Sequence, residues 1–134
     1  MALINGIEDE RIPFADRAVQ YGDGLFETIA VTDGRPRAWA RHMARLQRGC
    51  QRLGIPMPDT AVLAAEATRG CGEARNGVLK LIVSRGPGGR GYRPPADPQP
   101  TRMLALYPWP EYPQTYREQG VDVRLCSTRL ACSP

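Results

Sequence analysis

The sequence predicts an α+β domain, in which strands and helices occupy separate stretches of the chain. Three observations support this fold class. The dipeptides Asn5-Gly6 and Asp33-Gly34 each follow a short apolar run, as the turns of β-hairpins do. Apolar residues from Trp39 to Leu53 recur at alternating steps of four and three, the period of an amphipathic helix. Two later runs, residues 78–84 and 101–107, are rich in aliphatic residues and favour strands.

Residues 1–38 are expected to form two hairpins joined by an irregular corner. Ala2 to Ile4 is a short strand that turns at Asn5-Gly6, where both residues tolerate positive φ. Residues 13–24 break the strand pattern, with Asp16 suited to cap a short turn before a glycine-rich bend. Residues 25–32 are β-branched and aromatic, and return through residues 35–38.

Two helices are expected next. The first ends where Gly54 and Pro56 stop the apolar period that begins at Trp39. Asp59 caps a second helix, which ends near Gly70 and Gly72.

Residues 85–100 are dominated by glycine and proline and predict a loop between two neighbouring strands. We therefore divide the chain into an α/β domain over residues 1–107, a proline-stiffened connector over 108–119 and the start of a truncated second domain over 120–134. Residues 116–119 are expected to form a helical turn, and Val121 to Cys126 a strand whose partners lie beyond this chain.

Composition excludes several classes of protein. The chain has 134 residues, 42% hydrophobic and 24% charged, which is typical of one globular domain. It contains no apolar run long enough to span a membrane and no signal peptide, so a cytoplasmic protein is expected. The net charge of +4 comes from seventeen arginines and a single lysine. Four widely spaced cysteines and one histidine do not make a zinc site, and buried free thiols are expected instead.

Three segments are candidates for chemistry. In the first, residues 16–28 (DRAVQYGDGLFET), glycines precede Phe26 and Glu27 on alternating faces of a strand. The second is an arginine stripe at helical spacing, in which one guanidinium is able to bind a phosphate: Arg41, Arg45, Arg48 and Arg52. The third is the loop RGPGGRGY at residues 85–92, whose backbone amides and arginines suit carboxylates. From turn and helix chemistry alone, a hairpin corner is the more common explanation of the first segment, and a solvated helix face is the usual explanation of the second.

Lys80 is not expected to be a nucleophile. It lies mid-strand, and its neighbours on the same face, Val78 and Ile82, offer no acid, base or phosphate cradle. A strand lysine with its ammonium group at the surface is the expectation.

Taken in order, four segments resemble the class IV aminotransferase-like family of pyridoxal-phosphate enzymes: DRAVQYGDGLFET, RHMARL, NGVLKLIVSRGPGGRGY and RLACSP. The resemblance implies the N-terminal two-layer α/β domain of fold-type IV enzymes, similar to D-amino acid aminotransferases, with most of a larger C-terminal domain missing. The GGRGY loop is most similar to lyase members of the family, whereas branched-chain and D-amino acid aminotransferases resemble the chain mainly through YGDGLFE and HMARL.

The resemblance also implies a site. Its cofactor would be pyridoxal 5'-phosphate, held between two domains of a homodimer, and Arg45 falls on the family's cofactor-phosphate arginine. Phe26 and Glu27 fall on the strand that lines the cleft. Arg90 and Tyr92 fall on the loop expected to meet a small-molecule dicarboxylate substrate.

The Schiff-base lysine of the family would follow Pro134, so no catalytic residue is assigned within this chain, which is expected to be inactive alone. No metal, nucleic acid or membrane is expected as a partner.

Three alternatives remain open from the sequence. A transaminase for branched-chain or D-amino acids would use the same fold with different pocket loops. A small basic RNA-binding domain would use residues 85–93, although stacking aromatics are sparse there. The chain is also compatible with a fragment that pairs with another polypeptide.

Overall fold

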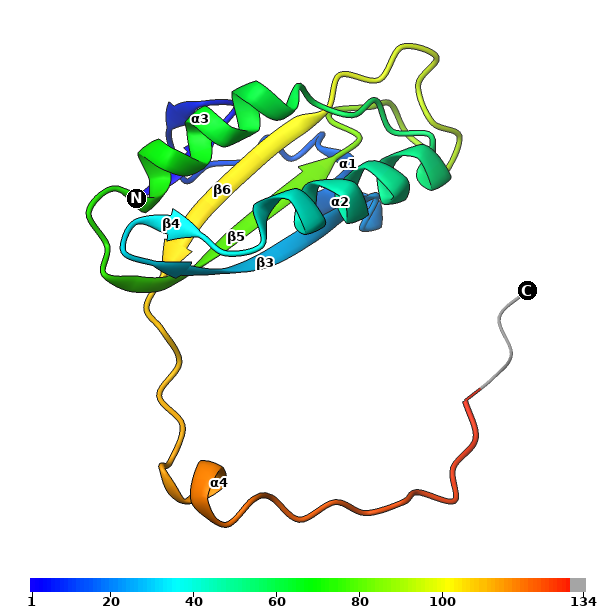
Figure 1. Cartoon of the computed structure of the whole chain (residues 1–134). Helices are drawn as coiled ribbons and strands as arrows, with labels where there is room; N and C mark the ends of the chain where they lie inside the picture. Colours follow the sequence, from blue (N-terminus) through cyan, green and yellow to red (C-terminus); the bar gives the residue numbers. More distant parts are fainter. Residues whose placement is uncertain (131–134) are drawn as a thin grey trace.

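An antiparallel sheet of six strands organises the chain, with strand order β2-β1-β6-β5-β3-β4 (Figure 1). The computed structural model describes residues 1–130. The strands are β1 (Ala2–Ile4), β2 (Ile7–Glu8), β3 (Gly24–Thr32), β4 (Arg35–Pro36), β5 (Asn76–Ser84) and β6 (Thr101–Tyr107). The helices are α1 (Arg17–Tyr21), α2 (Trp39–Leu53), α3 (Thr60–Cys71) and α4 (Thr115–Glu118). The predicted α+β class is confirmed.

Both predicted hairpins form. Asn5 and Gly6 join β1 to β2 with φ of 50° and 82°, and Asp33 and Gly34 join β3 to β4 with φ of 49° and 70°. Positive φ at both turn residues matches the twist of the flanking strands, which is why Asn-Gly and Asp-Gly occupy these positions.

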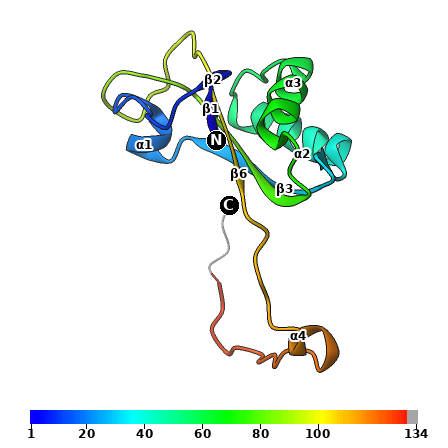
Figure 2. The same cartoon turned by 90° about the vertical axis from the view of Figure 1, so that its left-hand side faces the viewer.

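Helices α2 and α3 cover one face of the sheet, as Figure 2 shows. Gly54, in the left-handed conformation, ends α2, and the Asp59 side chain accepts from the backbone N–H of Ala61 to begin α3. The core lies between helices and sheet, where each fully buried leucine contributes about 2 kcal/mol. Its buried members include Leu3, Ile29, Val31, Leu46, Leu63, Leu79, Leu81, Val83 and Leu104.

The opposite face of the sheet has no long helix over it in residues 1–130, and only α1 and the loops near it lie on that side (Figure 2). Because side chains alternate along a strand, β3 turns Glu27 toward the helices and Phe26 toward the open face. Phe26 is accordingly 58% exposed, whereas Glu27 is 2% exposed. The two predicted site residues of β3 therefore face different environments.

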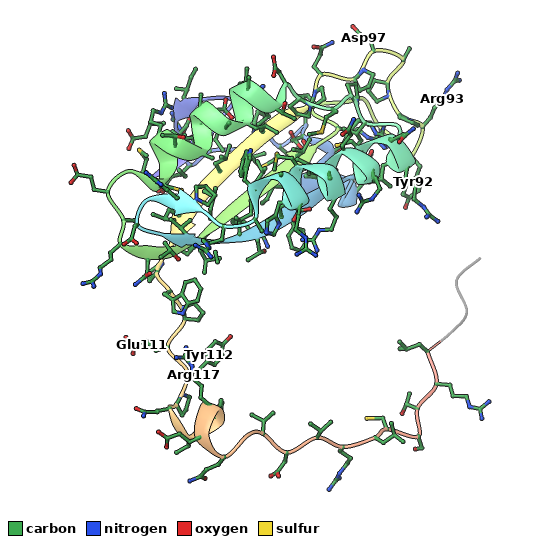
Figure 3. All side chains as sticks on the ribbon, viewed as in Figure 1. Tyr92, Arg93, Asp97, Glu111, Tyr112 and Arg117 are labelled. Carbon is green, nitrogen blue, oxygen red and sulfur yellow. The ribbon has the colours of Figure 1, made fainter. Side chains whose placement is uncertain are left out.

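Residues 108–130 leave the sheet as an extended, exposed segment that contains only the short helix α4 (Figures 1 and 3). The helical turn expected at residues 116–119 forms one residue earlier. The strand expected from Val121 to Cys126 is wrong for this structure, because no other strand lies beside that segment to pair with its backbone. The last four residues of the RLACSP segment lie outside the described part of the chain.

The expectation of buried thiols holds for Cys50 and Cys71, but Cys126 is exposed on the extended segment. Cys132 lies outside the described residues. In residues 1–130, none of the helices combines the length and the apolar character that a membrane crossing needs.

Candidate functional site

An ion pair between α2 and β3 forms the first part of the site. Arg45 donates from Nε to Glu27 Oε1 at 2.8 Å and from Nη2 to Oε2 at 2.5 Å. His42 Nδ1 lies 2.6 Å from Glu27 Oε2. The Glu27 side chain is 2% exposed, whereas that of Arg45 is 64% exposed. A buried carboxylate thus fixes the orientation of a guanidinium that remains open to solvent.

The charge state of this cluster follows from its contacts. Burial raises the pKa of Glu27, but the hydrogen bonds from Arg45 and then from His42 lower it by more, so the pKa lies below its ordinary value. The Glu27 hydrogen bond raises the pKa of Arg45. Both groups are therefore ionised at neutral pH.

Arg45 opens onto a shallow basic groove on the surface of α2. Its volume is about 370 Å³, and its walls are Ala38, Arg41, His42, Arg45 and Arg48. Arginines at this spacing lie on one side of a helix, and planar guanidinium groups match the oxygen geometry of phosphate. Among residues 1–130, Arg45 Nη1 donates to no protein acceptor. The groove therefore suits a small dianion such as a phosphate monoester, and three of the four arginines of the predicted stripe line it.

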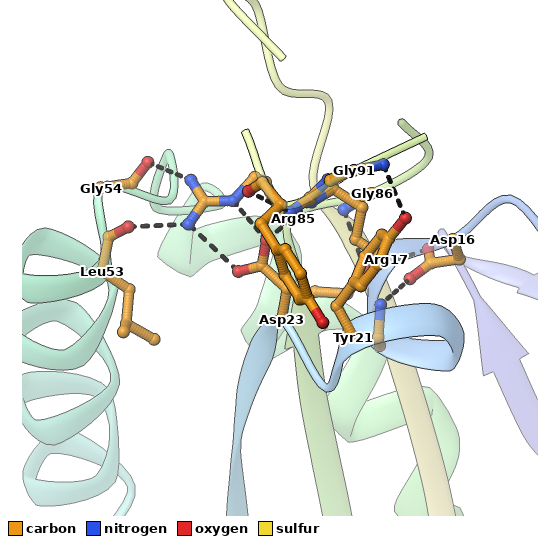
Figure 4. Close-up of polar contacts among 12 residues, drawn as sticks. Asp16, Arg17, Tyr21, Asp23, Leu53, Gly54, Arg85, Gly86 and Gly91 are labelled. Atoms are coloured by element: carbon orange, nitrogen blue, oxygen red, sulfur yellow. Dashed lines mark hydrogen bonds and ion pairs between the residues drawn. The ribbon is translucent and has the colours of Figure 1, made fainter. Parts of the chain in front are cut away.

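The second part of the site is the hairpin corner at the start of β3 (Figure 4). Asp23 accepts hydrogen bonds from Arg17 Nε at 2.7 Å and from Arg85 Nε and Nη2 at 2.8 and 3.1 Å. Arg85 also donates to the carbonyl oxygens of Leu53 and Gly54, at 2.8 Å each. The hydrogen bonds from Arg85 are the main reason that the pKa of Asp23 is lowered, with Arg17 adding to this effect against partial burial.

Asp16 links this corner to β5 and β6 through hydrogen bonds. It is fully buried and accepts from Ala18 N at 2.8 Å, Ser84 Oγ at 3.0 Å and Thr101 Oγ1 at 2.7 Å. The predicted capping role of Asp16 is confirmed, because its side chain caps α1. The same carboxylate joins the end of β5 to the beginning of β6, which fixes both ends of the loop over residues 85–100.

Residues 86–92 follow β5 and form the loop that the resemblance predicts to meet a substrate, so we call them the substrate loop. Tyr92 is 87% exposed at its tip and Arg90 is also exposed, and Figure 3 shows Tyr92 and Arg93 at the outer edge of the loop. Arg85 and Arg90 were both expected to be available to a carboxylate ligand, and for Arg85 this expectation is wrong. Arg85 is buried and engaged with Asp23 and α2, because its guanidinium satisfies the last carbonyls of that helix.

Phe26 and Lys80 lie together on the open face of the sheet. The Lys80 ammonium nitrogen is 3.6 Å from the centroid of the Phe26 ring, within the range of a cation–π contact. Lys80 lines an apolar groove of about 410 Å³ with Ile82, Met103, Ala105 and Tyr107. The predicted strand position of Lys80 is confirmed; the residue is half-buried, and its ammonium group contacts the Phe26 ring.

The structure thus brings some predicted site residues together. Arg45 and Glu27 are in direct contact, whereas no hydrogen bond or ion pair in residues 1–130 joins Arg90, Tyr92 or Phe26 to that pair. His42 was not predicted, although its position three residues before Arg45 places it on the same helix face. Arg17 and Asp23 were also missed, because nothing in the sequence shows that residues near 20 and near 90 meet.

Comparison with known proteins finds one matching family and several similar enzymes. The family model described as amino-transferase class IV matches residues 24–134. An aminodeoxychorismate lyase of Vibrio harveyi is 33% identical over 134 residues, which is 100% of this chain and 49% of the relative. A bifunctional aminodeoxychorismate lyase / D-amino acid transaminase of Mycobacterium tuberculosis is 37% identical over 98 residues, covering 66% of this chain and 34% of the relative.

Solved structures agree with these relatives. A 4-amino-4-deoxychorismate lyase from Pseudomonas aeruginosa superposes with a TM-score of 0.83 and 48% identity, over 90% of this chain and 44% of that chain. A hypothetical aminotransferase from Mycobacterium tuberculosis, in its PLP-bound form, superposes with a TM-score of 0.66 and 28% identity, over 82% of this chain and 40% of that chain. The present chain spans about half the length of the relatives it matches.

Proposed function

Because this chain belongs to the class IV aminotransferase family, we propose that it supplies the phosphate-binding and substrate-loop half of an aminodeoxychorismate lyase. The reaction converts 4-amino-4-deoxychorismate to 4-aminobenzoate and pyruvate, a step of folate biosynthesis. The observation that carries the cofactor assignment is the exposed Arg45 guanidinium, held in place by buried Glu27 within a groove of arginines.

Arg45 is the residue that would hold the phosphate of pyridoxal 5'-phosphate. Its Nε and Nη2 are committed to Glu27, so the remaining face of the guanidinium is fixed before any ligand arrives. Such preorganisation reduces the entropy lost on binding. Arg41 and Arg48 add positive charge on the same groove, which favours a dianion over a neutral ligand. When bound, pyridoxal phosphate supplies an electron sink for the reaction.

The substrate loop supports the lyase within this family. Its proposed substrate is a dicarboxylate, and the loop carries an exposed cation, Arg90, and an exposed hydroxyl-bearing ring, Tyr92, two residues apart in the sequence. A guanidinium and a phenol are both able to donate hydrogen bonds to a carboxylate. Phe26 would present its exposed ring to the cleft from β3.

The proposal concerns the full-length protein, since this chain spans about half of its relatives. The lysine that tethers the cofactor would come from the second half, and a second copy of the protein would complete a homodimer. We do not propose Lys80 for that role, because its ammonium group is engaged in a cation–π contact with the Phe26 ring and no arginine lines the groove that Lys80 borders.

The test is an assay of the full-length protein loaded with pyridoxal phosphate. Release of 4-aminobenzoate and pyruvate from 4-amino-4-deoxychorismate in equal amounts is expected. Absence of both products from a protein that binds the cofactor would overturn the lyase assignment. As a companion measurement, the isolated 134-residue chain is expected to show no absorbance of a lysine-bound cofactor. Such a band, lost on changing Lys80, would contradict the assignment of the tether.

A transaminase is the second candidate. Several relatives are D-alanine aminotransferases, one of which, from Staphylococcus epidermidis, is 26% identical over 117 residues. Amino transfer from a D-amino acid or a branched-chain amino acid to 2-oxoglutarate, without 4-aminobenzoate release, would favour this candidate.

A further inference from the structure

Three side chains near the start of β3, all buried or half-buried, form a connected group that contacts the end of the substrate loop. We call Arg17, Tyr21 and Asp23 the loop clamp. The Arg17 side chain is 3% exposed, and each of its three guanidinium nitrogens has a protein acceptor. Nε donates to Asp23 Oδ2 at 2.7 Å, Nη1 to the carbonyl of Gly91 at 3.1 Å and Nη2 to the carbonyl of Tyr92 at 3.0 Å (Figure 4).

Tyr21 contacts the same part of the loop. The backbone N–H of Gly91 donates to the Tyr21 hydroxyl at 3.0 Å, while the Gly91 carbonyl accepts from Arg17. The rings of Tyr21 and Tyr92 lie 5.5 Å apart, and the Arg17 guanidinium carbon lies 4.7 Å from the centroid of the Tyr21 ring. Both polar groups of the Gly91 backbone are therefore fixed, which orients the residues on either side of it.

The balance of buried charges explains why Arg17 needs these contacts. Asp23 is a single carboxylate shared by two buried guanidinium groups, those of Arg17 and Arg85. One positive charge thus depends on carbonyl oxygens for its solvation. Arg85 obtains them from the end of α2, and within residues 1–130 the carbonyl acceptors of Arg17 are those of Gly91 and Tyr92. Opening the loop would leave the buried Arg17 without those acceptors, which is costly.

From these contacts we infer that Arg17 and Tyr21 are positioning residues that set the orientation of Arg90 and Tyr92 and so control the affinity for substrate. The link to substrate rests on the proposed function, whereas the fixing of the loop does not. Neither residue is required to touch the cofactor, since Arg45 lies on α2 and is held separately by Glu27. Their loss is therefore expected to change substrate binding and to leave cofactor binding as it was.

The first test measures the loop itself in the 134-residue chain. Trypsin cleaves after Arg90, whereas the bond after Arg93 precedes Pro94 and resists it. Tyr21→Phe removes one hydrogen bond and keeps the ring, so cleavage at Arg90 is expected to be about 5-fold faster. Arg17→Lys keeps the charge but loses the three-way contact, and a larger acceleration is expected. Cleavage after Arg124, on the exposed segment, provides the internal control and should not change.

Tyr112→Phe is the matched control variant, because Tyr112 is an exposed tyrosine of the connector far along the chain from the loop. Its cleavage pattern should equal that of the unchanged protein. If Tyr21→Phe and Arg17→Lys, folded as judged by circular dichroism, are also cut at Arg90 at the unchanged rate, the clamp does not fix the loop and the inference is wrong.

The second test uses the full-length enzyme. Tyr21→Phe and Arg17→Lys are expected to raise KM for 4-amino-4-deoxychorismate by about 5-fold or more with kcat reduced less, at unchanged cofactor absorbance. An unchanged KM beside faster cleavage would overturn the role in substrate binding. If the unchanged enzyme makes no 4-aminobenzoate, the proposed function fails instead, and the cleavage rates decide the clamp by themselves.

Discussion

Glu27 and Arg45, 18 residues apart in the sequence, form a two-pronged ion pair in which the carboxylate is buried and the guanidinium is exposed. This asymmetry distinguishes the pair from an ordinary surface salt bridge, which orders neither partner and contributes little. The Glu27 carboxylate is shielded from water, so hydrogen bonds from Arg45 and His42 must stabilise its negative charge. The same two hydrogen bonds hold the Arg45 guanidinium in one orientation at the edge of the basic groove.

The pair makes stability depend on pH in the acid range. The pKa of Glu27 is lowered in the folded protein, so its contribution to stability is fully present above its ordinary pKa of about 4.3 and is lost as pH falls through the lower folded value. Glu27→Gln is expected to lower the free energy of unfolding by about 1 kcal/mol at pH 7, allowing for screening of exposed Arg45. Urea unfolding at pH 7 and at pH 3 measures this, and the difference should shrink at the lower pH. Glu73→Gln, at an exposed position, serves as control. A constant difference at both pH values would contradict the assignment.

Arg45→Ala is expected to weaken cofactor binding to the full-length protein by at least about 10-fold, because a preorganised charged donor to phosphate is lost. Titration with pyridoxal phosphate, followed by absorbance, measures the dissociation constant. Arg52→Ala removes an exposed arginine from the same helix outside the groove and should bind the cofactor as the unchanged protein does. Equal binding by both variants would remove Arg45 from the site.

Two glycines of the loop region should differ in how strongly a change to alanine destabilises the protein. A Cβ on Gly86, whose φ is +86°, would lie 1.7 Å from the Gln99 carbonyl oxygen, whereas a Cβ on Gly89 meets nothing within 4 Å. We expect Gly86→Ala to cost about 3 kcal/mol or more, because backbone must move, and Gly89→Ala to change stability by less than about 1 kcal/mol. Urea unfolding compares the two. Similar stabilities would show that the loop does not return past Gly86 as described.

Thiol reactivity should separate the body of the protein from its extended segment. Burial raises the pKa of Cys50 and of Cys71, whereas Cys126 is exposed. At neutral pH we expect iodoacetamide to modify Cys126 at least about 100-fold faster than Cys50 or Cys71, which require opening of the core. Peptide mass mapping over time measures each rate. Rapid labelling of Cys71 in folded protein would contradict the packing of α3.

Local structure was predictable wherever short-range chemistry decides it. The Asn5-Gly6 and Asp33-Gly34 turns, the amphipathic period of α2 and the cap of α3 at Asp59 depend on residues within a few positions of one another. The alternation of Phe26 and Glu27 along β3 follows in the same way from the period of a strand. The resemblance to the class IV family was also readable from local motifs, and the family match confirms it.

Contacts between distant segments were not predictable. The contacts of Glu27 with His42 and Arg45 depend on how α2 packs on the sheet. The contacts of Arg85 with Asp23 and of Arg17 with Gly91 depend on the pairing of β3 with β5, which no local pattern fixes. The expected strand at residues 121–126 failed for the same physical reason, since a strand exists only where another strand satisfies its backbone. Sequence alone therefore determined the hairpins, the two long helices and the family of this protein. Tertiary structure decided which charges are buried, which partners compensate them and which guanidinium stays open to a ligand, because these depend on contacts between distant segments.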